Sequence, residues 1–227
     1  MIVAMGGASL RPEDYDPRLN DFVLSLARSG RPRVCFVGTA SGDAPTYVSS
    51  FYRSFSAHHD CELADLALFE RTVADLRGFV LSQDVIWVGG GNTASLLAVW
   101  RMHGLDVVLR EAWEQGVVLC GVSAGMNCWF EGSTTDSFDL SRLAALPDGL
   151  GLLPGSCCPH YDGEEQRRPL YTQLVADGAL APGYAADDAA ALVFEGTELR
   201  EVVTTAEGAC AYRVTADGEK PLAARLL

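Results

Sequence analysis

The segment Gly121-Val122-Ser123-Ala124-Gly125 carries the residue types and spacing best suited to covalent chemistry. It follows the apolar run Val117–Cys120 and precedes a predicted helix. Glycines two positions on either side leave room for a strained turn that exposes a serine at the edge of a sheet. The helix N-terminus there could stabilise negative charge on an attacked carbonyl oxygen. The pattern predicts a nucleophile elbow at Ser123, and a serine in an ordinary tight turn is the alternative.

A nucleophilic serine needs a base, and histidine is the usual one. His58, His59 and His103 end predicted helices, where such side chains cap the last carbonyl groups. His160 instead follows the small and apolar run Leu152–Pro159 and opens a polar loop. We therefore predict His160 as the base, with a purely structural histidine as the alternative.

A third group, a carboxylate, would orient the histidine. Asp136, Glu131, Asp139 and Asp162 compete for this role. A helix running from Ser123 to Glu131 would carry that carboxylate roughly 12 Å along its axis, too far for an easy contact. Asp136 follows a Gly-Ser-Thr-Thr turn and can fold back. The ranking is Asp136, then Glu131, then Asp139, and a helix that ends early would favour Glu131.

A glycine-rich run, Gly89-Gly90-Gly91-Asn92-Thr93, lies between a predicted strand and a predicted helix. It matches neither the P-loop nor the dinucleotide-binding motif, so a nucleotide site is disfavoured. Its glycines let the backbone approach a ligand closely. The N–H groups of Gly91 and Ala124 could therefore form an oxyanion hole, although a plain tight turn would give the same run.

Composition restricts the classes of function. The formal net charge is −13, and no cluster of lysine and arginine is present, which disfavours nucleic acid as a partner. No apolar stretch reaches the roughly 20 residues that a membrane span needs, and the N-terminus lacks a secretory pattern. Seven cysteines, two of them in predicted buried strands, indicate a reducing cytoplasm. The adjacent pair Cys157-Cys158 is a poor template for zinc, so no metal is expected.

The pattern of apolar runs predicts an α/β fold in a single domain over residues 1–227. As far as about residue 130, short β-rich runs alternate with helical stretches, which is typical of a doubly wound, mainly parallel sheet flanked by helices. The predicted strands are Ile2–Met5, Arg33–Val37, Glu62–Leu68, Val85–Val88 and Val117–Gly121. The predicted helices are Asp16–Ser29, Thr46–Ala57, Asn92–His103 and Leu105–Gln115.

The C-terminal part differs in composition and in its pattern of apolar residues. Gly132–Ser156 is rich in glycine, serine, threonine and proline and is predicted as a long functional loop. A helix follows over Glu165–Ala176. Alternating runs between Ala190 and Leu226, separated by Glu-Gly and Asp-Gly turns, predict antiparallel hairpins that extend one edge of the sheet.

Three motifs together resemble a known family. Gly89-Gly90-Gly91-Asn92-Thr93, the serine turn around Ser123, and Pro159-His160-Tyr161 resemble, in order and spacing, the peptidase E (aspartyl dipeptidase) and cyanophycinase family of serine peptidases. The likeness covers most of the chain. It implies a flavodoxin-like fold, similar to that of the class I glutamine amidotransferases, and a catalytic mechanism without a cofactor.

The resemblance also implies roles for individual residues. Ser123 becomes the nucleophile and His160 the general base, while the amides of Gly91 and Ala124 hold the oxyanion. The acid of the family can be matched to Asp136 only by placing a gap. The residues expected to contact the substrate are Gly90, Asn92 and Arg167.

One departure from the family bears on substrate choice. The aspartyl dipeptidases carry an arginine that grips the substrate aspartate just before a Glu-Gln-Arg run, and this chain has Glu164 there. With the strongly negative net charge, this difference argues against a preference for Asp-X dipeptides. Arg167 or Arg168 could replace the missing charge, but pairing of these arginines with Glu164 or Glu165 on a solvated helix face is favoured.

The sequence thus predicts a cytoplasmic serine peptidase that cleaves short peptides through an acyl-enzyme. A cyanophycinase-like β-aspartyl peptidase and an esterase are alternatives with the same catalytic groups. A binding or sensing protein that has lost its triad acid is an alternative of another class. A homodimer is compatible with such a domain, but no residue selects an interface.

Overall fold

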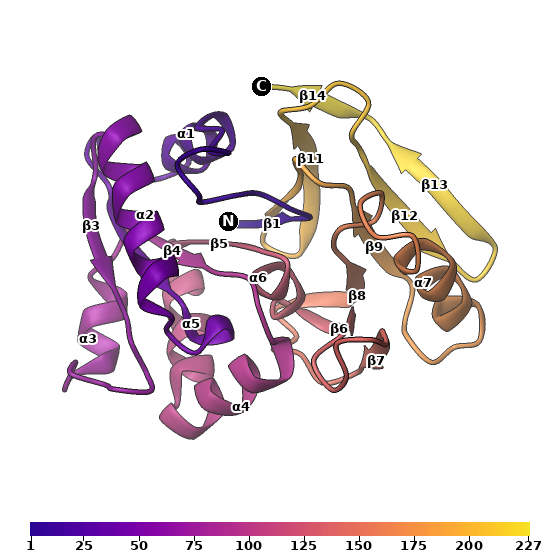
Figure 1. The fold of residues 1–227 in the computed structure, drawn as a ribbon, viewed down its shortest axis with the longest axis horizontal. Helices are drawn as coiled ribbons and strands as arrows, with labels where there is room; N and C mark the ends of the chain where they lie inside the picture. Colours follow the sequence, from indigo (N-terminus) through magenta and orange to yellow (C-terminus); the bar gives the residue numbers. More distant parts are fainter.

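The computed structural model describes residues 1–227 and contains strands, α-helices and one short 3-10 helix (Figure 1). The strands are β1 (Ile2–Met5), β2 (Arg33–Val37), β3 (Glu62–Asp65), β4 (Val85–Val88), β5 (Val118–Val122), β6 (Phe130–Thr135), β7 (Ala144–Leu146), β8 (Leu153–Cys158), β9 (Gly183–Ala186), β10 (Ala190–Glu195), β11 (Glu198–Thr204), β12 (Ala211–Thr215), β13 (Gly218–Leu222) and β14 (Ala224–Leu226). The helices are α1 (Arg18–Ser25), α2 (Pro45–His58), α3 (Leu76–Leu81), α4 (Thr93–His103), α5 (Leu105–Glu114), α6 (Ala124–Asn127) and α7 (Arg167–Ala176), with the 3-10 helix at Thr39–Ser41.

The larger sheet has eight strands in the order β14-β11-β10-β1-β5-β4-β2-β3. Its centre, from β1 to β3, is parallel. Alternate residues of these strands enter two different hydrophobic clusters, one under α1 and α2 and the other under α3, α4 and α5. A parallel sheet covered on both faces requires strands that are apolar on both sides, which explains the continuous hydrophobic runs. The prediction of a doubly wound α/β fold is confirmed.

The smaller sheet was not predicted. Its six strands follow the order β13-β12-β9-β8-β6-β7, and α7 packs on β9 and β12 (Figure 1). The segment predicted as the loop Gly132–Ser156 contributes β7 and parts of β6 and β8. Of the predicted C-terminal hairpins, only the β10–β11 pair and β14 extend the larger sheet, because β12 pairs with β9 instead. Alternation identifies a strand but does not specify its partner.

His59, predicted as a cap at the end of a helix, connects α1 and α2 through side-chain hydrogen bonds. The His59 side chain is only 1% exposed. Its Nδ1 lies 2.9 Å from Asp21 Oδ1, and its Nε2 lies 2.5 Å from the hydroxyl of Tyr15. Burial lowers the pKa of His59 below its ordinary value of 6.5.

This buried histidine makes stability depend on pH. The unfolded chain takes up a proton near pH 6.5, whereas the folded chain resists it, so acidification favours unfolding. We expect the free energy of unfolding to fall as the pH drops from about 7 to about 5, and to fall less steeply in His59→Gln, whose side chain does not titrate. Urea unfolding of both proteins across this range measures the difference. Parallel pH profiles would show that His59 does not contribute.

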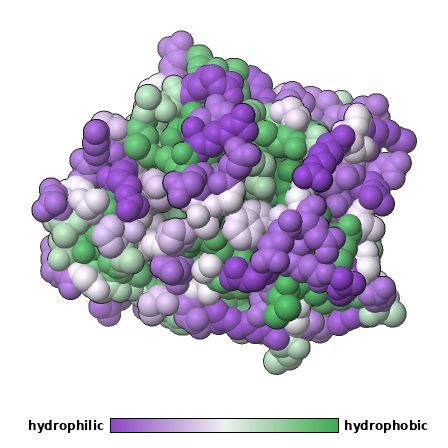
Figure 2. All heavy atoms as spheres, turned by 180° about the vertical axis from the view of Figure 1, so that it is seen from behind, coloured by the Kyte–Doolittle hydropathy of each residue, from purple (hydrophilic) through white to green (hydrophobic).

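The surface carries only scattered apolar side chains. The exposed large hydrophobic residues are Phe69, Met102, Val107, Phe138, Leu140 and Leu226. On the face in Figure 2, hydrophobic residues emerge in patches that hydrophilic residues interrupt. None of the helices is long and apolar enough to cross a membrane.

Candidate active site

The serine turn has the strained geometry that its glycines predict. Ser123 follows β5 and precedes α6, with φ 57° and ψ −110°. A Cβ on Gly121 would lie 2.6 Å from the carbonyl oxygen of Gly125, and one on Gly125 would lie 2.4 Å from that of Val88. Positions 121 and 125 therefore require glycine. The backbone conformation of Ser123 itself is one that L-residues rarely adopt. Such strain is characteristic of a nucleophile held at the end of a strand.

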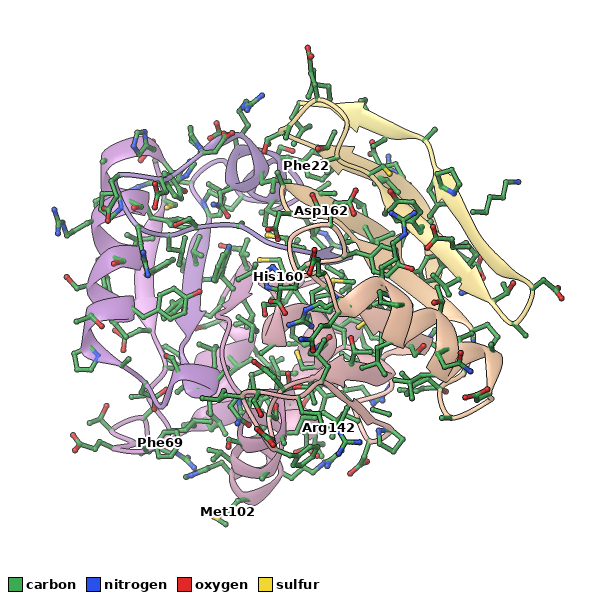
Figure 3. All side chains as sticks on the ribbon, turned by 45° about the vertical axis from the view of Figure 1, so that its right-hand side comes forward. Phe22, Phe69, Met102, Arg142, His160 and Asp162 are labelled. Carbon is green, nitrogen blue, oxygen red and sulfur yellow. The ribbon has the colours of Figure 1, made fainter.

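The C-terminal end of β1 holds the serine and the predicted base side by side. The carbonyl oxygen of Met5 accepts a hydrogen bond from Ser123 N–H at 3.2 Å. The carbonyl oxygen of the next residue, Gly6, accepts one from His160 N–H at 3.3 Å. Two residues that are far apart in the sequence are thus fixed to consecutive peptide groups. Figure 3 shows His160 near the middle of the molecule, between the N-terminal half and the C-terminal strands.

The imidazole of His160 is oriented by Asp188. Nδ1 of His160 lies 2.6 Å from Asp188 Oδ1, whereas Nε2 has no partner within the protein. The hydrogen bond from His160 lowers the pKa of the Asp188 carboxyl below its ordinary value of 3.8, against the opposing effect of burial. The backbone N–H of Asp188 in turn donates to Asp162 Oδ1 at 2.8 Å. An ionised carboxylate on Nδ1 leaves Nε2 free to accept a proton.

A glycine at the end of β1 makes room for this pair. Gly7 bridges to Asp188, and its carbonyl oxygen accepts a hydrogen bond from Ala189 N–H at 2.9 Å. A Cβ on Gly7 would lie 1.9 Å from Asp188 Oδ1 and 3.0 Å from His160 Nδ1. The three consecutive residues from Met5 to Gly7 therefore anchor the serine turn, the histidine and the aspartate segment.

None of the carboxylates ranked from the sequence reaches His160, so that ranking is corrected. Glu131 Oε2 accepts a hydrogen bond from Gly155 N–H at 2.8 Å. Asp139 Oδ1 accepts from both the backbone N–H and the hydroxyl of Ser141. Asp136 lies in a separate hollow of about 260 Å³ together with Arg142 and the 164–166 segment. The chain does not fold back at Asp136 to bring it to His160. Strand β6 continues to Thr135 and places Asp136 in that hollow instead.

The glycine-rich loop lies against the serine. A Cβ on Gly90 would lie 3.4 Å from Ser123 Cβ. Gly91 has φ 136°, and a Cβ built on it would lie 2.3 Å from the carbonyl oxygen of Ala40. The N–H groups of Gly91 and Ala124 donate to no acceptor within the protein. Free backbone N–H groups beside a nucleophile are what an oxyanion hole requires.

Asn92, which was predicted to contact the substrate, has both side-chain groups engaged within the protein. Its Oδ1 caps α4 by accepting from Ser95 N–H at 2.8 Å, and its Nδ2 donates to the carbonyl oxygen of Ser137 at 2.8 Å. Asn92 therefore fixes the loop between β4 and α4 to the segment after β6.

The two arginines considered as substitutes for the missing one are also engaged. Arg167 pairs with Glu164 at 2.8 Å, as favoured from the sequence, but its side chain is only 5% exposed rather than on a solvated face. Arg168 pairs with Glu219 and lies over the rings of Tyr161 and Tyr212. Both arginines are thus paired with a carboxylate of the protein, while Nη1 of Arg167 is buried without a hydrogen-bond partner.

A cavity of about 460 Å³ opens beside the histidine–aspartate pair. Small residues from the end of β1 and from the 189 and 205 turns line it, together with Asp14, Asp16, His160 and Asp188. Arg18 pairs with Asp16 and His160 with Asp188, whereas Asp14 has no ion-pair partner. No group of three His, Cys, Asp or Glu side chains in the structure could hold a metal ion.

An α/β sheet that presents a strained serine between a glycine-rich loop and a histidine defines a serine-type hydrolase. The model of peptidase family S51 matches residues 2–202, and the chain belongs to this family. It is a serine-type peptidase.

Two proteins illustrate the sequence similarity. The chain is 48% identical over 213 residues to an uncharacterized peptidase, YgaJ, of Bacillus subtilis (strain 168), covering 94% of this chain and 91% of that protein. It is 29% identical over 208 residues to a peptidase E of Shewanella denitrificans, covering 81% and 88%.

Solved structures share the fold. A peptidase from an acI-B1 Actinobacterium aligns with a TM-score of 0.73 at 19% identity, covering 98% of this chain and 93% of that one. A putative peptidase E protein from Listeria monocytogenes EGD-e aligns with a TM-score of 0.66 at 18% identity, covering 90% and 98%. The predicted family and fold class are confirmed.

Proposed function

We propose that this protein hydrolyses short peptides with Ser123, His160 and Asp188 as its catalytic triad. The observation that carries the proposal is the hydrogen bond between His160 and Asp188. The backbone of His160 is bonded to Gly6, next to Met5, which holds the backbone of Ser123. Nucleophile, base and orienting acid are the parts that acyl transfer from a serine needs.

The mechanism follows from these positions. Ser123 Oγ attacks the carbonyl carbon of the scissile peptide bond as its proton passes to Nε2 of His160. The carbonyl oxygen becomes an oxyanion that accepts hydrogen bonds from the amides of Gly91 and Ala124. The C–N bond then breaks, the amine leaves with the proton from His160, and an acyl-enzyme remains. A water molecule, deprotonated by His160, then attacks the acyl group. The bond from the acyl carbon to Ser123 Oγ breaks, His160 returns the proton to Oγ, and the acid is released.

The charges around the site support peptides other than Asp-X as substrates. Glu164 occupies the position of the aspartate-binding arginine, and its partner Arg167 is buried in the pair. Asp14 adds negative charge in the cavity beside His160. A substrate carboxylate that entered this cavity would meet repulsion, whereas a neutral or cationic side chain would not.

The proposed function is tested with a dipeptide panel that contains Asp-X, neutral and basic members, and with aryl esters in parallel. We expect the wild type to hydrolyse neutral or basic dipeptides faster than Asp-X, and Ser123→Ala to hydrolyse none. Turnover confined to Asp-X would contradict the proposed preference. Turnover of aryl esters alone would favour the esterase alternative.

Covalent labelling tests the alternative of a non-catalytic protein. That alternative assumes that the triad acid is lost, and the hydrogen bond that Asp188 accepts from His160 argues against it. A fluorophosphonate probe should label wild-type Ser123 stoichiometrically. No labelling and no turnover would together overturn the proposed function.

A further inference from the structure

We propose that Tyr47 is a positioning residue for the oxyanion hole, acting through the backbone of Gly90. The inference rests on the proposed function, because an oxyanion hole has meaning only for an acyl-transfer site. Tyr47 lies in the first turns of α2 and belongs to none of the motifs that identify the site in the sequence.

The glycine-rich loop is held between two surfaces. On one side, Gly90 lies against the Ser123 side chain, with its built Cβ position 3.9 Å from Oγ. On the other side, Ala40 closes the loop, since its carbonyl oxygen accepts a hydrogen bond from Asn92 N–H at 2.8 Å. This backbone bond fixes the end of the loop. At the start of the loop, the N–H of Gly89 donates to the carbonyl oxygen of Val37 at 3.0 Å. These two backbone bonds leave the Gly90 amide, between them, without a backbone partner.

Tyr47 supplies that restraint. Its hydroxyl oxygen accepts a hydrogen bond from Gly90 N–H at 3.2 Å. Its ring lies so close to the loop that a Cβ on Gly89 would be 2.9 Å from Cε1. The ring in turn packs edge-on against Phe36 of β2, with the centroids 5.1 Å apart. Packing of the Tyr47 ring against the buried Phe36 therefore fixes the position of the hydroxyl.

The contact with Tyr47 gives the two neighbouring amides of the loop different hydrogen-bonding states. The N–H of Gly90 is taken up by Tyr47, whereas the N–H of Gly91 has no acceptor and remains for the oxyanion. Burial raises the pKa of Tyr47 above its ordinary value of 10.0, so the phenol stays neutral where the enzyme works. Without the hydroxyl, the Gly90 amide would lose its partner and the loop could rotate away from the serine.

The variant Tyr47→Phe tests this inference because it removes only the hydroxyl and keeps the ring packing. Loss of one hydrogen bond that matters in the transition state is expected to lower the rate constant for fluorophosphonate labelling of Ser123, and kcat, about tenfold. KM and the pH dependence of kcat should stay unchanged, because neither substrate contacts nor the His160–Asp188 pair is altered. The Gly90 amide resonance should shift and exchange faster with solvent.

The matched control is Tyr52→Phe on the same helix. Tyr52 also loses a hydrogen bond on substitution, the one its hydroxyl donates to Asp65 Oδ1 at 2.8 Å, but it lies away from the glycine-rich loop. We expect this control to keep the wild-type labelling rate. Equal labelling rates in Tyr47→Phe and the wild type, or an equal loss in both variants, would overturn the inference alone. Failure of the wild type to be labelled would overturn the proposed function and this inference with it.

Discussion

Replacing Asp188 with asparagine is expected to lower kcat by on the order of 10³–10⁴-fold. The amide keeps the shape of the carboxylate but can present an N–H to Nδ1 of His160, which would favour the imidazole tautomer that cannot take the serine proton at Nε2. It also loses the negative charge that stabilises the imidazolium formed during attack. Steady-state kinetics on the best dipeptide of the panel measures the effect. KM is expected to change little, because Asp188 acts through His160.

The controls for this prediction are the carboxylates ranked from the sequence. Asp136→Asn and Glu131→Gln leave the His160–Asp188 hydrogen bond intact, so both should retain activity within about threefold of the wild type. A large loss in Asp136→Asn, with Asp188→Asn active, would assign the acid to Asp136 and contradict the geometry described above. Circular dichroism and thermal unfolding of each variant separate a loss of catalysis from a loss of fold.

The surroundings of Ser123 and His160 could be predicted because local sequence determines them. The serine turn requires glycines at fixed offsets, and these glycines are visible in the chain. His160 was identified as the histidine that follows a strand instead of ending a helix. Both inferences need only the immediate neighbours of the residue.

Asp188 was missed because its position depends on pairing between distant strands. It lies 28 residues after His160, in the turn between β9 and β10. β9 pairs with β8 of the smaller sheet, whereas β10 pairs with β1 of the larger one. The chain thus crosses from one sheet to the other at this aspartate. A local signal existed in Asp187-Asp188, two acidic residues at the end of an apolar strand, but nothing local connected it with His160.

The parallel core of the fold could be predicted because its signal, unlike that of Asp188, is local. The hydrophobic runs of β1, β2 and β4 match their predicted bounds, since burial on both faces leaves a continuous apolar signal. The smaller sheet contains short strands with glycine, serine and proline, such as β8, which resemble loop sequence. Helix α3 was missed as well, because its six residues are too few for a periodic pattern.

Replacing Gly7 with alanine is expected to lower kcat by about 10²-fold while the protein still folds. The new Cβ would lie 1.9 Å from Asp188 Oδ1, so the carboxylate must move away from His160. A Cβ on Gly163 would lie 2.6 Å from the other oxygen, Oδ2, which shows how closely the backbone surrounds this group on both sides. Because the atom in the way is the end of a side chain, the backbone can persist while the hydrogen bond to Nδ1 is lost.

Gly30→Ala is the matched control for this substitution. No heavy atom lies within 4 Å of a Cβ built on Gly30, and its φ is not in the left-handed region, so the same chemical change meets no obstacle there. We expect Gly30→Ala to keep wild-type kcat and thermal stability. If Gly7→Ala also kept wild-type kcat, the end of β1 would not set the geometry of the pair. If it lost activity only in proportion to a loss of folded protein, Gly7 would serve the fold alone. A folded Gly7→Ala protein with kcat lowered about 10²-fold would instead show that the end of β1 determines the position of the Asp188 carboxylate.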